Sequence, residues 1–188
     1  MENITDINWL YHKYYNDNPL LKRIVYIHSL QVARKALKIL VDKGLPLDPK
    51  DVYSAAMLHD IGVVKCNATD IHAMGQLPYI LHGIEGSKIL IENGLHQFAD
   101  ICMTHTGAGI SIEEIISNHL PLPHIDMIPD TLLEKLICYA DKFYSKSHDL
   151  KREKPLEEVV NQIKKFGSGS LNRFKEMHKI FGEQDIII

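Results

Sequence analysis

Cysteine is scarce and scattered in this 188-residue chain. The three cysteines, Cys66, Cys102 and Cys138, lie far apart, and no C-x-x-C pair occurs among them. An odd number of cysteines without close pairs is a poor disulfide framework and offers no zinc knuckle or redox motif. The cysteine pattern therefore argues against a disulfide-rich secreted fold and fits a reducing compartment.

Long apolar runs and an excess of positive charge are also missing. No run approaches the roughly eighteen apolar residues of a membrane span. The first residues, MENITDINWLYHKYY, lack the basic segment followed by an apolar segment that marks a secretory signal, so we expect a cytoplasmic protein. The chain has 21 Lys+Arg against 24 Asp+Glu, a net charge of -3. Without a basic patch to contact phosphates, neither a nucleic-acid nor a membrane partner is expected.

Alternating strand patterns with Asn-Gly or Asp-Gly turns are absent as well, whereas helical periodicity covers most of the chain. We therefore predict an all-α fold, with enough hydrophobic residues (45%) to bury one core. Asn18-Pro19 and Asp48-Pro49 are helix-start signals. The expected helices cover about residues 4–15, 19–44, 49–62, 78–92, 95–105, 111–118, 130–146, 155–165 and 170–181, with a loop at 63–76.

Six ionisable residues interrupt the apolar faces of these helices. One inward histidine is more often a hydrogen-bonded core residue than a ligand, but an inward aspartate is costly unless it meets a cation. A cation at the centre would remove that cost for all six, and imidazole with carboxylate is a ligand set for transition metals. The six candidate ligands are His28, His59, Asp60, His82, His105 and Asp141.

The order of these residues, H…HD…H…H…D, includes the run His59-Asp60-Ile61-Gly62. Their contexts are HSLQVA, LHGIEGSKIL, THTGAG and YADK. This pattern resembles the HD-domain superfamily of metal-dependent phosphohydrolases, and in particular its HDIG subgroup of small stand-alone proteins. The resemblance covers about residues 20–145. It implies a single all-α HD domain over residues 1–188, with the helices of 155–181 packed on its core.

The resemblance also implies a binuclear metal centre. His28, His59, Asp60 and Asp141 would hold one divalent ion, and Asp60 would bridge to a second ion held by His82 and His105. Mixed nitrogen and oxygen ligands suit Fe, Mn, Co, Ni and Zn alike. A metal-activated hydroxide, oriented by Asp60, would then attack a nucleotide or another small phosphate ester.

Departures from the family pattern limit the substrate. The HDxxED motif of enzymes that hydrolyse guanosine tetraphosphate is absent, which disfavours that activity. Val63 stands where cyclic-dinucleotide phosphodiesterases of the family carry a phosphate-binding lysine. Lys65, two residues further on, is a candidate substrate contact, and a solvated surface lysine is the alternative.

Three residues near the expected ligands are further candidates. Glu85 follows His82 by three residues and could act as a catalytic proton relay, or could pair with Lys88 on the helix surface. Thr106 and Gly107 follow a candidate ligand and could contact substrate, or could form a plain helix stop.

The remaining polar and aromatic features have simpler interpretations. The Lys/Glu-rich stretch 146–158 is expected to be a solvated face. The aromatic residues Trp9, Tyr11, Tyr14 and Tyr15 are expected to pack the first helix on the core, with a homodimer contact as the alternative. The other seven histidines are expected on the surface, with His72 as the candidate exception: His12, His72, His96, His119, His124, His148 and His178.

Two other functions fit the same ligand pattern. Some HD-fold proteins with these six ligands resemble di-iron oxygenases that cleave C–C or C–P bonds. A sensor that keeps its metal without catalysis is the third possibility. Ligand types alone do not separate the three.

Overall fold

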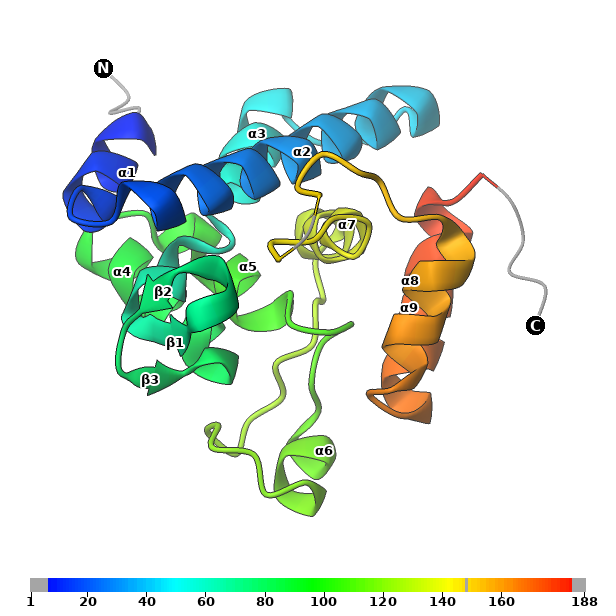
Figure 1. Cartoon of the computed structure of the whole chain (residues 1–188). Helices are drawn as coiled ribbons and strands as arrows, with labels where there is room; N and C mark the ends of the chain where they lie inside the picture. The colour runs from blue at the N-terminus through cyan, green and yellow to red at the C-terminus, as the bar shows by residue number, and fades with distance from the viewer. Residues whose placement is uncertain (1–6, 148, 184–188) are drawn as a thin grey trace.

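The computed structural model describes residues 7–147 and 149–183 and is built mainly of helices, which confirms the all-α prediction (Figure 1). Residues 4–6 of the first expected helix, and His148, lie outside the described residues. The α-helices are α1 (Ile7–Tyr15), α2 (Pro19–Lys43), α3 (Pro49–Leu58), α4 (His82–Glu92), α5 (Ala99–Thr104), α6 (Ile112–Ser117), α7 (Leu132–Asp141), α8 (Leu156–Lys164) and α9 (Ser168–Phe181).

The segment expected to be a loop at 63–76 instead carries short regular elements. They are η1 (Ile61–Lys65), β1 (Cys66–Ala68), η2 (Thr69–Ile71) and β2 (Ala73–Met74). Next come β3 (Leu77–Pro78) and η3 (Tyr79–Leu81), so α4 begins later than expected, and η4 (His96–Phe98) precedes α5. The strands form a sheet in the order β2-β1-β3, antiparallel between β1 and β2 and parallel between β1 and β3. Strands of two or three residues are too short to show alternation, so the sequence pattern did not reveal them.

The start signals of α2 and α3 work as expected. The Asn18 side chain accepts a hydrogen bond from the backbone N–H of Leu21, and the Asp48 side chain accepts one from Lys50. Each cap satisfies a backbone donor that the first helical turn leaves open. These caps fix where two helices begin: α2, which carries His28, and α3, which ends directly before His59.

Helix α2 crosses one side of the molecule and packs against α3 and α7. In Figure 1, α7 is seen end-on at the centre, between α4, α5 and the small sheet on one side and α8 and α9 on the other. Buried side chains of all these helices except α6 belong to one hydrophobic cluster, and Ile115 of α6 belongs to a second, smaller one. Within the described residues, no helix has both the length and the apolar character needed to cross a membrane. The metal-ligand candidates lie inside this helical core.

Gly62 allows η1 and α4 to approach each other closely. A Cβ atom at Gly62 would lie 2.1 Å from the carbonyl oxygen of His82 and 2.2 Å from the backbone nitrogen of Gly86. Because both neighbours are backbone atoms, they cannot move aside as a flexible side chain would. Glycine at this position therefore sets the distance between the segment of Asp60 and the start of α4.

Helix α1 is tied to the backbone around the HD motif by two buried tyrosines. The Tyr11 hydroxyl donates to the carbonyl oxygen of Met57 at 2.7 Å, and the Tyr15 hydroxyl donates to that of Ile61 at 2.9 Å. Trp9, in contrast, is 48% exposed. The two tyrosines thus pack α1 on the core and hold the chain on both sides of His59 and Asp60.

Two surface expectations are wrong. His178 is buried where α9 packs on α7, and its Nδ1 lies 2.9 Å from the Tyr139 hydroxyl of α7. Lys154, inside the stretch expected to be a solvated face, is also buried. The other described histidines outside the cluster are exposed, including the candidate exception: His12, His72, His96, His119 and His124.

Candidate metal centre

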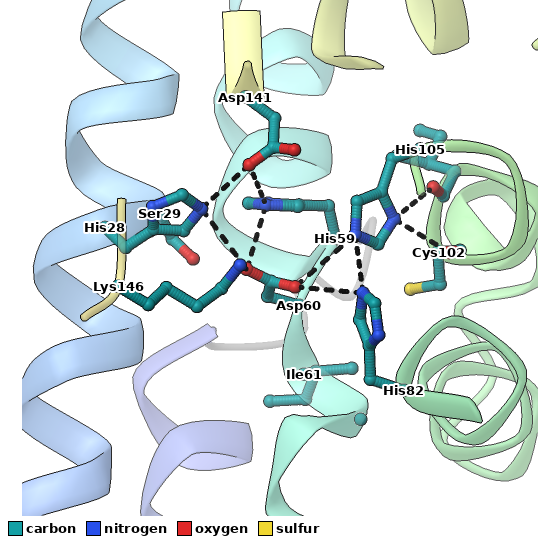
Figure 2. Close-up of polar contacts among 12 residues, drawn as sticks. His28, Ser29, His59, Asp60, Ile61, His82, Cys102, His105, Asp141 and Lys146 are labelled. Carbon is teal, nitrogen blue, oxygen red and sulfur yellow. Dashed lines mark hydrogen bonds and ion pairs between the residues drawn. The ribbon is translucent and has the colours of Figure 1, made fainter. Parts of the chain in front are cut away.

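The structure brings the six candidate ligands together in one buried cluster (Figure 2). They come from five helices, and all but His28 lie at or next to a helix end, where a short turn can aim the side chain inward. Their residues are 0 to 8% exposed: His28, His59, Asp60, His82, His105 and Asp141.

One group of four residues surrounds Asp60 Oδ2 and Asp141 Oδ1. His28 Nε2 lies 2.9 Å from Asp141 Oδ1 and 3.3 Å from Asp60 Oδ2. His59 Nε2 lies 3.1 Å from the same Asp60 oxygen and 3.5 Å from the same Asp141 oxygen. The candidate ligand atoms of this group all lie within 4.8 Å of one another, so one ion can contact all four residues.

A second group uses the other oxygen of Asp60. His82 Nε2 lies 3.5 Å and His105 Nε2 lies 3.4 Å from Asp60 Oδ1. Asp60 therefore belongs to both groups and presents one carboxylate oxygen to each. A carboxylate placed in this way can offer one ligand atom to each group.

Three of the histidine rings are oriented by backbone carbonyl groups. The Nδ1 atoms of His59, His82 and His105 lie 2.6, 2.7 and 2.8 Å from the carbonyl oxygens of the residues three positions earlier. Because a carbonyl oxygen only accepts, each Nδ1 must carry the proton and donate it. The Nε2 atom of a neutral ring is then free to act as a ligand.

These protons make the contact between His82 and His105 informative. Their Nε2 atoms face each other at 3.0 Å. With both Nδ1 atoms protonated, two neutral rings would direct lone pairs at each other. In addition, Asp60 Oδ1 is buried without a hydrogen-bond partner. A cation between these atoms satisfies them all, so the residues present fit a divalent metal site.

Two lysines, which the sequence patterns did not reveal, already place positive charge beside the carboxylates. Lys146 Nζ lies 2.7 Å from Asp60 Oδ2, and Lys142 Nζ lies 2.6 Å from Asp141 Oδ2. Helix α7 ends at Asp141 and not at residue 146 as expected, and the segment that follows turns Lys146 back toward the cluster. The sequence offered one hint of these lysines, since Lys142 directly follows the candidate ligand Asp141.

The charges in the cluster shift the pKa values of its members. Burial opposes ionisation of Asp60 and Asp141, but Lys146 beside Asp60 and Lys142 beside Asp141 outweigh it and hold both pKa values well below the usual range. Burial also opposes protonation of His59, yet Asp60 and Asp141 raise its pKa to about 9. Burial lowers the pKa of His82 to about 3 and also lowers the pKa of His105. The second group is therefore neutral imidazole, the form that binds metals.

The remaining candidate residues lie around this cluster in different settings. Glu85 pairs with Lys88 at 2.6 Å, the alternative considered from the sequence, so a relay role stays a prediction. Lys65 is exposed at the end of η1. The Thr106 hydroxyl is buried without a hydrogen-bond partner, and Gly107 lines a cavity that also reaches Asp141.

Comparison with known proteins places this cluster in a family. The family model described as HD domain matches residues 25–145, which include all six candidate ligands. Two relatives are named tRNA (cytidine(56)-2'-O)-methyltransferase: that of Picrophilus torridus is 32% identical over 136 residues, and that of Thermoplasma volcanium is 30% identical over 147 residues. An uncharacterized protein of Methanocaldococcus jannaschii is 35% identical over 118 residues.

The matches cover different shares of these relatives. They include 72% and 77% of this chain but only 35% and 38% of the two methyltransferases, so the chain spans little more than a third of their length. For the Methanocaldococcus protein the shares are 61% and 62%. The family match over most of the chain and the buried His/Asp cluster agree, and the chain belongs to the HD domain family.

Proposed function

We propose that this protein is a metal-dependent phosphohydrolase that acts on a nucleotide or another small phosphate ester. The observation that carries the proposal is the shared carboxylate: Asp60 presents one oxygen to each of two ligand groups. Two bound ions of that kind lower the pKa of water toward 7 and neutralise an attacked phosphate group.

The protein contributes order and charge to this chemistry. Asp60 bridges the two groups, and the carbonyl groups behind His59, His82 and His105 hold their rings in place. Lys142 is held in turn, because its Nζ donates to the carbonyl oxygen of His105 at 2.8 Å. Ligands that are fixed before metal and substrate arrive reduce the cost of assembling the site.

A cavity of about 180 Å³ beside the cluster supports a phosphate substrate. Asp141, Lys142 and Lys146 line one side of it, next to the candidate ligands. Lysines attract phosphate groups, which favours a hydrolase over the oxygenase that the ligands alone leave open. Phe166 lines the same cavity and is 61% exposed, so its ring is available to stack on a nucleotide base.

The names of the two tRNA methyltransferases are no basis for proposing a methyltransferase activity for this protein, because the chain corresponds to little more than a third of each of them. They do leave open an RNA partner, against the expectation from composition. The expected absence of a nucleic-acid partner and the cytoplasmic location therefore stay predictions, as does the homodimer.

Metal analysis coupled to a hydrolysis screen tests the proposal. Protein purified without chelator is expected to carry close to two transition-metal ions per chain. With Mn²⁺ it should release phosphate from members of a nucleotide panel. Asp60→Asn should abolish that release, whereas Asp70→Asn, at an exposed position in η2, should leave it unchanged. A metal content below about 0.5 ion per chain would contradict the proposal.

The same experiment separates the other two functions. Oxygen uptake by the iron-loaded protein, without phosphate release, would indicate the oxygenase. A folded, metal-loaded protein that turns over neither class of substrate would indicate the sensor.

A further inference from the structure

Lys154 is an unusual residue in the cavity beside the metal centre. The residue is 9% exposed, and its Nζ donates to Gln162 Oε1 at 2.9 Å. Among the ion pairs of the described residues, none joins Lys154 to a carboxylate, whereas Lys142 and Lys146 each have one. A buried ammonium group without an opposite charge is costly, and burial accordingly lowers the pKa of Lys154. Asp141 and Glu158 favour the charged form from a longer range, but no carboxylate of the described chain lies within ion-pair distance of this ammonium group.

The position of Lys154 relative to the cluster follows from the elements around it. Its backbone N–H donates to the carbonyl oxygen of Phe143 at 2.8 Å, which ties the start of α8 to the end of α7. The side chain then faces the cavity from the α8 side, together with Gln162 and Ile163. Asp141, Lys142 and Lys146 line the side nearest the metal centre. One cavity therefore connects the candidate metal ligands to a second positive group.

The residues that line this cavity carry more positive than negative charge. Three lysines line it, and Asp141 is the carboxylate in its lining. Asp141 and Asp60 are also the partners of Lys142 and Lys146. Once those two carboxylates are shared with metal ions, the excess of positive charge grows. An anion is the ligand that balances it.

We propose that Lys154 forms an anion subsite that binds a second phosphoryl group of the substrate, beyond the group attacked at the metal centre. This inference rests on the proposed phosphohydrolase function and narrows its substrates to those with two or more linked phosphate groups. Lysine suits the role because it presents a point charge that an adjacent phosphoryl oxygen can approach from several directions. Gln162 orients the ammonium group toward the cavity.

Binding of non-hydrolysable probes tests the subsite. The full chain, loaded with Mn²⁺ and freed of excess metal, is titrated calorimetrically with methylenediphosphonate and with methylphosphonate. The wild-type protein is expected to bind the diphosphonate at least tenfold more tightly than the monophosphonate. Lys154→Met should lose most of that preference and keep its affinity for methylphosphonate. The control Lys151→Met, at an exposed position in the same segment, should behave as wild type.

The controls keep the outcome clear. Lys154→Met should fold, because it removes a buried charge and keeps an apolar stem. Lys154→Gln provides a second neutral variant that can still bond Gln162, and it should show the same loss. Equal diphosphonate affinity in wild type and both variants would overturn the subsite, as would a parallel loss for both probes. Because neither probe is hydrolysed, the test is independent of turnover, and absent phosphate release would count against the proposed function alone.

Discussion

Removing the charge of Lys146 should destabilise the metal-free protein much more than the metal-loaded one. Lys146 Nζ lies 2.7 Å from Asp60 Oδ2, and Asp60 is fully buried. Breaking a buried ion pair from one side costs about 3–5 kcal/mol. His59, which is protonated because its pKa is about 9, remains 3.1 Å from the same oxygen, so the lower end of that range applies to Lys146→Met. We therefore expect a loss of about 3 kcal/mol.

The loss is measurable as a thermal midpoint. In a chain of this size, 1 kcal/mol corresponds to about 2–4 °C, so the metal-free Lys146→Met variant should unfold about 6–12 °C below wild type. Saturating Mn²⁺ would supply the missing positive charge at Asp60 and close most of this gap. The metal-induced rise in midpoint should accordingly be larger in the variant than in wild type.

Differential scanning calorimetry, with and without Mn²⁺, provides the measurement, and Lys151→Met is the matched exposed control. Equal midpoints of variant and wild type without metal would refute the reasoning. An equal rise on metal addition would refute it as well, because Lys146 would then not be the charge that metal replaces.

Three further predictions follow from single contacts. Affinity for Mn²⁺ should rise about tenfold per pH unit between pH 7 and 9, because the metal must displace the proton that Asp60 and Asp141 hold on His59. Calorimetry in buffers of different ionisation enthalpy measures the released proton, and an affinity that does not change with pH would contradict this prediction. Gly62→Ala should cost about 3 kcal/mol in urea unfolding, since its Cβ would meet backbone atoms at 2.1 and 2.2 Å, and wild-type stability would show that the close packing is wrong. Phe166→Ala should raise the KM about fivefold or more for a nucleotide substrate but not for glycerol phosphate, because only the nucleotide loses a base-stacking contact. An equal change in KM for both substrates would exclude stacking.

The fold class and the clustering of the candidate ligands could be predicted from the sequence because both depend on local spacing. Helical periodicity repeats every 3.6 residues and is visible along a single chain. It marked His28, His59 and Asp141 as polar residues on apolar faces, and such residues need a shared partner in the core. Metal ligation is also a matter of side-chain type, so imidazole and carboxylate groups could be recognised before any contact was known.

The tertiary structure decided how those candidate ligands divide into two groups and what surrounds them. Which oxygen of Asp60 faces which histidines depends on the crossing of five helices, and no spacing along the chain encodes it. Lys146 and Lys154 were expected on a solvated face, because a lysine-rich stretch has the local pattern of a surface. Burial is set by distant segments: α7 ends early, the chain turns back over the cluster, and α8 closes the cavity. Long-range packing therefore made two lysines of ordinary appearance part of the site.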